Sequence, residues 1–164
     1  MKKGEDLVFQ PSGIRGRVES IKVFPREVAE AGAGDSVGIV VGSEVGRGNV
    51  GGHPQSTPSS TVRLRGEVVI LEGVLKPGDE LEMKCATSKV RCKVAEIQER
   101  ISSETGEVIE KNPDEIGENE AATIIFETEP LVVEKFSQIP ELGRYILVIN
   151  GKNVGAGIVL EANC

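Results

Sequence analysis

The residues that could do chemistry are few, and none has a partner at a useful spacing. The one histidine, His53, lies in a Gly-Gly-His-Pro turn, and a lone loop histidine is far more often exposed than catalytic. Cys85 and Cys92 are seven residues apart with no second pair, so they lack the spacing of a zinc site. The 164 residues contain no GxxxxGK(S/T) phosphate-binding loop. The sequence therefore predicts no catalytic residue, no metal site and no cofactor.

Two further patterns favour structural roles over binding. Residues 96–120 hold nine acidic and two basic side chains but lack the D-x-D-x-D-G pattern of a calcium loop, so we expect a solvated loop. Gly155 and Gly157 flank one alanine inside a strand-like run, which indicates close packing rather than a phosphate site. Cys92 lies among alternating apolar residues, and we expect it to be a small buried side chain.

A basic stripe is the best candidate for binding. Lys89, Arg91 and Lys93 alternate with apolar residues, so a strand here would place all three cations on one face. That face could contact phosphate groups, or it could be an ordinary solvated face. The whole chain has a formal net charge of −7, which argues against a nucleic-acid binder driven by bulk charge.

The elements that must position these residues are strands and tight turns. The chain has 20 glycines, no tryptophan and 3% aromatic residues, which is typical of a small β-barrel with an aliphatic core. The one helix candidate is 25–33, which Gly32 would end, and the alternation over 15–23 slips once near Ser20, as at a β-bulge. Period-two or continuous apolar runs predict strands at 7–9, 15–23, 37–41, 61–71, 80–84, 89–97, 121–126, 131–133, 145–149 and 154–160.

The chain divides at residues 54–60, which read PQSTPSS and cannot bury a core, so they predict a linker. Residues 1–53 carry seven basic and seven acidic side chains, whereas residues 61–164 carry twelve basic and nineteen acidic ones. No apolar run is long enough to cross a membrane, and Glu5 and Asp6 stand where a signal peptide needs apolar residues. We therefore expect a cytoplasmic protein that does not engage a membrane.

The motifs of both parts resemble the β-domains of one family. The pattern is that of translational GTPases of the elongation factor 1-alpha and EF-Tu type, in its archaeal and eukaryotic form. The second part carries Cys92-x-x-Ala95-Glu96-Ile97, Ser103-Glu104-Thr105-Gly106, Glu134-x-Phe136-x-x-Ile139-Pro140-x-Leu142-Gly143-Arg144-Tyr145 and Gly151-x-Asn153-Val154-Gly155-x-Gly157. The first part carries Lys3-Gly4-Glu5-Asp6, Gly16-Arg17-Val18-Glu19-Ser20-Ile21, Ala33-Gly34-Asp35-Ser36-Val37-Gly38 and Arg47-Gly48-Asn49-Val50.

This resemblance implies an all-β protein with two barrel units. Residues 1–53 would form a partial barrel like the family's domain two, and residues 61–164 a complete barrel like its domain three. The 164 residues lack the motifs of the GTPase domain, so we expect no GTPase or other enzyme activity. Ser36 stands where the family has an asparagine near the pocket for the aminoacyl end of tRNA. Val148 and Ile149 replace a charged pair that faces the GTPase domain in the family.

Three interpretations of function remain open, and the third is a degenerate remnant without activity. The first is weak, salt-sensitive binding to the backbone of tRNA, through Lys89, Arg91, Lys93, Arg144 and Lys152. The second is a protein-interaction or self-association module. It would use an exposed surface at Val148 and Ile149, or the open edges of the partial barrel.

Overall fold

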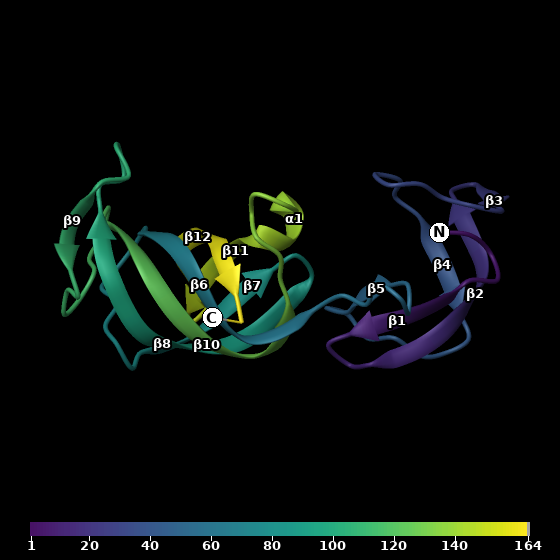
Figure 1. The fold of residues 1–164 in the computed structure, drawn as a ribbon, viewed down its shortest axis with the longest axis horizontal. Coiled ribbons are helices and arrows are strands. Elements are labelled where there is room, and N and C mark those ends of the chain that lie inside the picture. The colour runs from purple at the N-terminus through teal and green to yellow at the C-terminus, as the bar shows by residue number, and fades with distance from the viewer. Residues whose placement is uncertain (164) are drawn as a thin grey trace. The chain divides into compact units, whose positions relative to one another are not determined.

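The computed structural model describes residues 1–163, and they fold into two compact units. Unit 1 comprises Met1–Pro58 and unit 2 comprises Ser59–Cys164, so the division falls inside the segment 54–60. Both units are built from strands, which confirms the all-β fold class (Figure 1). No helix among residues 1–163 has both the length and the apolar character that spanning a membrane requires.

Unit 1 is an open, curled antiparallel sheet. The strand order is β3-β2-β1-β5, and β4 pairs with another stretch of the long strand β2. The β2–β4 register shifts between Val18 and Ser20, which confirms the predicted bulge. The strands are β1 (Asp6–Gln10), β2 (Ile14–Val23), β3 (Arg26–Val28), β4 (Gly38–Val41) and β5 (Val50–Gly52).

The core of unit 1 is small because the sheet does not close. Its core cluster of buried hydrophobic residues consists of Leu7, Phe9, Val18 and Ile21. The remaining apolar side chains that pack against them are only partly buried, namely Met1, Val28, Ala31, Val37, Ile39, Val41 and Val45.

Unit 2 is a closed six-stranded barrel. Its strands follow the order β10-β6-β12-β11-β7-β8, and a pairing between β10 and β8 closes the ring. The seventh strand, β9, extends β8 outside the ring. The strands are β6 (Ser60–Ile70), β7 (Glu80–Cys85), β8 (Ser88–Ile101), β9 (Val108–Lys111), β10 (Ala121–Val132), β11 (Arg144–Ile149) and β12 (Lys152–Ala162).

Tyr145 organises one side of the barrel core. Its ring packs edge-on against Phe126 with the centroids 5.8 Å apart, and its hydroxyl donates to the Glu67 carbonyl over 3.2 Å. Two glycines make room for this ring. A Cβ at Gly66 would lie 2.2 Å from the Tyr145 hydroxyl oxygen, and one at Gly157 would lie 2.6 Å from it. The Gly-Ala-Gly run is therefore a packing feature, as predicted.

Some sequence predictions fail in detail. The one helix candidate, 25–33, does not form a helix, because Arg26–Val28 pairs with β2 as strand β3. The short helix α1 (Pro140–Gly143) was not foreseen. The acidic run 96–120 is not a plain solvated loop, because it includes the end of β8 and all of β9. Within it, Ile116 is fully buried and bridges to Leu75.

Candidate functional site

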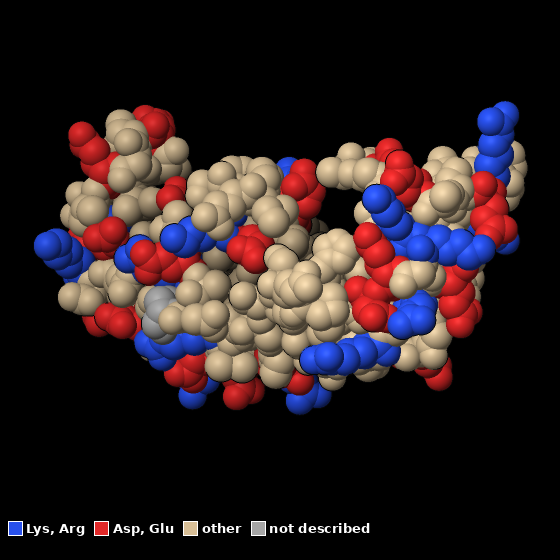
Figure 2. Space-filling model, turned by 45° about the vertical axis from the view of Figure 1, so that its right-hand side comes forward, with Lys and Arg blue, Asp and Glu red and all other residues tan. Residues whose placement is uncertain are grey.

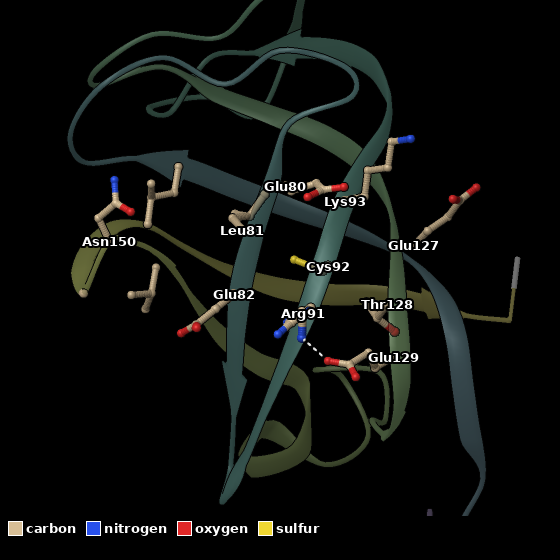
Figure 3. Close-up of a pocket in the computed structure, with 13 residues that line it drawn as sticks. Glu80, Leu81, Glu82, Arg91, Cys92, Lys93, Glu127, Thr128, Glu129 and Asn150 are labelled. Carbon is tan, nitrogen blue, oxygen red and sulfur yellow. Dashed lines mark hydrogen bonds between the residues drawn. The ribbon is translucent and has the colours of Figure 1, made fainter.

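A depression of about 620 Å³ on the barrel wall of unit 2 brings together four of the predicted binding residues. It lies across β7, β8 and β10 and reaches the turn between β11 and β12. Arg91 and Lys93 line it (Figure 3). Val148 and Ile149 line it as well. Antiparallel pairing of β7 with β8 and of β8 with β10 brings these strands together.

Glutamates flank the basic stripe on both neighbouring strands. Lys93 lies opposite Glu80 on β7 and opposite Glu127 on β10. In the next row Arg91 lies opposite Glu82, and the Arg91 backbone N–H donates to Oε1 of Glu129 over 2.7 Å. The stripe of cations therefore runs between two stripes of anions, so the local potential is much weaker than three cations alone would produce.

The floor of the depression is apolar and chemically inert. Leu81 and Cys92 are buried there, and burial raises the pKa of the Cys92 thiol to about 12. Burial also raises the pKa of Cys85 to about 11, and its Sγ donates to the Leu142 carbonyl over 3.5 Å. Because a thiol reacts as its thiolate, neither cysteine is poised as a nucleophile. The prediction that Cys92 is a small buried side chain is confirmed.

The five predicted tRNA-binding cations do not form one patch. Lys89 makes an ion pair with Glu82 over 3.1 Å, and Lys152 pairs with Glu72 over 3.9 Å. No ion pair is found within residues 1–163 for the other three, which are Arg91, Lys93 and Arg144. Figure 2 shows the same mixture on the face in view, where Lys and Arg are interspersed with Asp and Glu.

Arg144 lies at a second, more apolar groove of about 750 Å³ on unit 2. The groove includes Phe136, Ile146 and Ile158, with Lys84 also at the site. Arg144 starts β11 and is exposed, and Ile158 of β12 lies opposite it. Its guanidinium is therefore available to a ligand, but it does not extend the stripe on β8.

The predicted exposed surface at Val148 and Ile149 is wrong for Val148. Its side chain is only 2% exposed, although it belongs to the wall of the depression. Ile149 is half-buried and packs against the barrel core. Val148 and Ile149 thus extend the packing of the barrel instead of forming an exposed patch.

Ser36 and His53 lie in unit 1. Ser36 is exposed in the segment before β4, so its hydroxyl is accessible. His53 is about half exposed, with Nδ1 3.9 Å from a Glu5 carboxylate oxygen. No cluster of three or more His, Cys, Asp or Glu side chains suited to a metal ion is found within residues 1–163.

The sequence reasoning missed the glutamates of the depression. A signal was present for Glu80 and Glu82, whose spacing of two places both on the outer face of a strand. Glu127 and Glu129 follow the same spacing at the end of β10. Only the strand register shows that these four residues border Arg91 and Lys93.

The comparisons with known proteins agree with this architecture. The family model described as "GTP-eEF1A C-terminal domain-like" matches residues 63–160. Elongation factor 1-alpha of Methanothermobacter thermautotrophicus is 33% identical over 168 residues, which cover 98% of this chain and 41% of that protein. The same factor from Methanocella arvoryzae is 35% identical over 172 residues, covering 98% and 40%.

A solved structure shows the same fold. Sup35 in complex with GDP superposes with a TM-score of 0.94 at 22% sequence identity, over 100% of this chain and 42% of that one. The fold and the matched residues define a protein of two translation-factor-like β-domains. The chain belongs to the GTP-eEF1A C-terminal domain-like family, and it spans about two fifths of the length of these two elongation factors.

Proposed function

We propose that this chain is a non-catalytic binding module of the translation apparatus that works in the cytoplasm and contacts the backbone of tRNA. The observation that carries the proposal is the pair Arg91 and Lys93, two neighbouring exposed cations on β8 without an ion pair in residues 1–163. Arg144 supplies a third accessible cation on the same barrel. Family membership supports translation as the setting.

A binding role fits the chemistry of the described residues better than catalysis. The two thiols in the barrel are buried and protonated at neutral pH. The lone histidine, His53, lies in unit 1 with Nδ1 3.9 Å from a Glu5 carboxylate oxygen. The phosphate-binding loop of a GTPase is absent from these 164 residues.

The flanking glutamates set the strength of such binding. Each phosphate contact releases counterions, so three cations would give a slope of log K against log salt of roughly −2 to −3. Glu80, Glu82, Glu127 and Glu129 repel a polyanion from the same surface. We therefore expect weak binding that is detectable at low salt and lost at moderate salt.

The test is a titration of labelled aminoacyl-tRNA at low and at moderate salt, with deacylated tRNA as a second ligand. The double variant Arg91→Ala/Lys93→Ala should lose most of the affinity. The matched control is Lys111→Ala/Lys135→Ala, which removes two exposed cations elsewhere on unit 2. Absence of binding at low salt, or equal losses in both double variants, would contradict the proposal.

Acylation adds a second readout that concerns Ser36. Preference for aminoacyl-tRNA over deacylated tRNA would support a remaining aminoacyl-end pocket in unit 1. Ser36→Ala should then reduce this preference without changing the affinity for deacylated tRNA. Equal binding of both tRNAs would leave only backbone contacts.

The second candidate function is protein interaction through the same depression. The alternating rows of Glu, cation and Glu favour it, because a protein surface can match mixed charges whereas a polyanion cannot. In this proposal the charged rows of the depression form the interaction surface, in place of the predicted surface at Val148, which is buried. A chain that binds neither tRNA nor a translation protein would be a remnant.

A further inference from the structure

Strand β8 lacks a strand partner on one side at Arg91. On the side that faces β10, the pairing ends where Cys92 lies opposite Thr128, and Arg91 is the next residue beyond that point. There β10 becomes irregular, because its register with β6 shifts between Glu127 and Leu131. The other side of β8 still pairs with β7. Among residues 1–163, no strand therefore supplies a carbonyl to Arg91 on the β10 side.

A side-chain carboxylate takes the place of the missing carbonyl. The Arg91 N–H donates to Oε1 of Glu129 over 2.7 Å (Figure 3), which is short for an N–H···O bond and typical of an ionised acceptor. Both residues are exposed, so the core does not fix the carboxylate. No ion pair within residues 1–163 involves Glu129. This hydrogen bond is therefore the contact that ties its carboxylate to β8.

The surroundings of this N–H suit a phosphate group. Backbone N–H groups contact phosphate oxygens in many nucleic-acid complexes, and a phosphate oxygen is an ionised acceptor like a carboxylate. The side chains of Arg91 and Lys93 lie on the same outer face of β8 and line the same depression. Neither makes an ion pair among the described residues. The depression thus offers one N–H and two cations to an anion, and Glu129 occupies the N–H.

We propose that Glu129 is a built-in competitor for phosphate at the Arg91 N–H. In the free chain its carboxylate accepts that hydrogen bond, and a phosphate oxygen accepts it instead when the ligand binds. The carboxylate leaves the N–H as the phosphate arrives, so the two anions do not have to share one donor. This inference rests on the proposed function of unit 2. It adds the donor of one phosphate contact and the residue that limits the affinity.

The competition predicts different effects for two glutamates of the same depression. Glu129→Ala removes a negative charge and also frees the Arg91 N–H. Glu80→Ala is the matched control that removes a charge alone, because Glu80 is exposed on β7 and makes no ion pair within residues 1–163. A hydrogen bond to a charged group is worth about tenfold in affinity. The gain in tRNA affinity from Glu129→Ala should therefore exceed the gain from Glu80→Ala by about tenfold.

The first measurement is an NMR titration of the isotope-labelled full chain with inorganic phosphate, at an ionic strength held constant with chloride. In Glu129→Ala the amide resonance of Arg91 should shift saturably with phosphate. It should shift much less in the unmodified chain and in Glu80→Ala, where the carboxylate still holds the N–H. The amide of Lys111 on β9 reports any general effect of the ions. An Arg91 amide that ignores phosphate in folded Glu129→Ala would overturn the proposal.

The second measurement repeats the tRNA titration at low salt with both variants. Equal gains for Glu129→Ala and Glu80→Ala would contradict the competition, because charge alone would explain them, while tRNA binding itself would stand. The reverse case is also distinguishable. If no variant bound tRNA but phosphate still shifted the Arg91 amide of Glu129→Ala, the proposed function would fail and the phosphate site would stand.

A further pair of variants covers the case in which Glu129→Ala harms the fold. Glu129→Gln keeps the length of the side chain and a neutral acceptor, so it weakens the bond to the Arg91 N–H without deleting it. Its gain in tRNA affinity and its phosphate-dependent shift at Arg91 should be smaller than those expected for Glu129→Ala. Both should still exceed those of Glu80→Gln, and equal values for the two glutamine variants would refute the competition.

Discussion

Unit 1 and unit 2 use the same kind of strand, and they differ in whether the sheet closes. In unit 2 the pairing of β10 with β8 completes a ring, and a core cluster of twenty buried residues fills it. In unit 1 the sheet stays open, and four residues make up the buried cluster. Closure therefore decides how much apolar surface leaves the water.

The largest loss of stability should follow a substitution at the centre of the closed barrel. Phe126→Ala removes a fully buried ring that packs on Tyr145, and we expect a loss of about 3–5 kcal/mol in the free energy of unfolding. Tyr145 is the one tyrosine in a chain without tryptophan, so its fluorescence reports on unit 2 alone. A urea titration followed by that signal measures the change. A loss below about 1 kcal/mol would contradict the view of a tightly packed barrel.

A comparable substitution in the open sheet should cause a smaller loss of stability, and the loss should be confined to unit 1. Ile21→Ala removes a fully buried side chain, but its partly exposed neighbours can collapse into the space, so we expect about 2 kcal/mol. Far-UV circular dichroism should show an earlier transition for unit 1, while the Tyr145 midpoint stays in place. If the midpoint of the Tyr145 fluorescence transition shifted as much as the circular dichroism transition, the two units would unfold together.

A third test concerns Gly157, which lies close to Tyr145 and to the Glu67 backbone. A Cβ at Gly157 would lie 2.2 Å from the Glu67 carbonyl oxygen, so Gly157→Ala forces the barrel wall to shift and should cost about 1–3 kcal/mol. Gly155→Ala is the control, because its nearest contact would be 3.2 Å. Equal midpoints for both variants in the urea titration would argue against the packing role of Gly157.

The smallest expected change in stability comes from the Arg100–Glu120 ion pair near the base of the β8–β9 hairpin, and it depends on pH. A hydrogen bond from Arg100 holds the pKa of Glu120 below its usual value, and Arg100 also pairs with Glu110. The stabilisation is present above the ordinary glutamate pKa and is lost as the pH falls through the lowered pKa. Glu120→Gln should therefore reduce thermal stability at pH 7 but not at a pH below both values.

Glu107→Gln serves as the control for this pH dependence, because Glu107 is an exposed glutamate beyond the hairpin tip. Its melting temperature should follow that of the unmodified chain at every pH. A difference between Glu120→Gln and the unmodified chain that persists at low pH would contradict the linkage, because a protonated Glu120 no longer forms the ion pair.

Much of the fold could be predicted because strands record their environment in local patterns. The alternation around Ser20 predicted the bulge in β2, and the Gly155–Gly157 spacing predicted close packing. Short segments were harder. β3 has three residues, and its place in the sheet depends on pairing with β2 rather than on its own composition.

The candidate site was less accessible to sequence reasoning. Lys89, Arg91 and Lys93 were correctly placed on one face of a strand, because alternation is a local property. Their electrostatic surroundings depend on residues from about ten to forty positions away in the chain, such as Glu80 and Glu129. The exposure predicted for Val148 failed for a similar reason, since burial of one side chain depends on what its neighbours cover.

The amino-acid sequence by itself determined the strand content, the division near residues 54–60 and the family of the chain, because these follow from local alternation, turn residues and motifs. The tertiary structure decided which sheet closes, which edge stays free and which charges meet. Those properties depend on the register between strands distant in the sequence, and a shift of one residue would move every side chain to the opposite face.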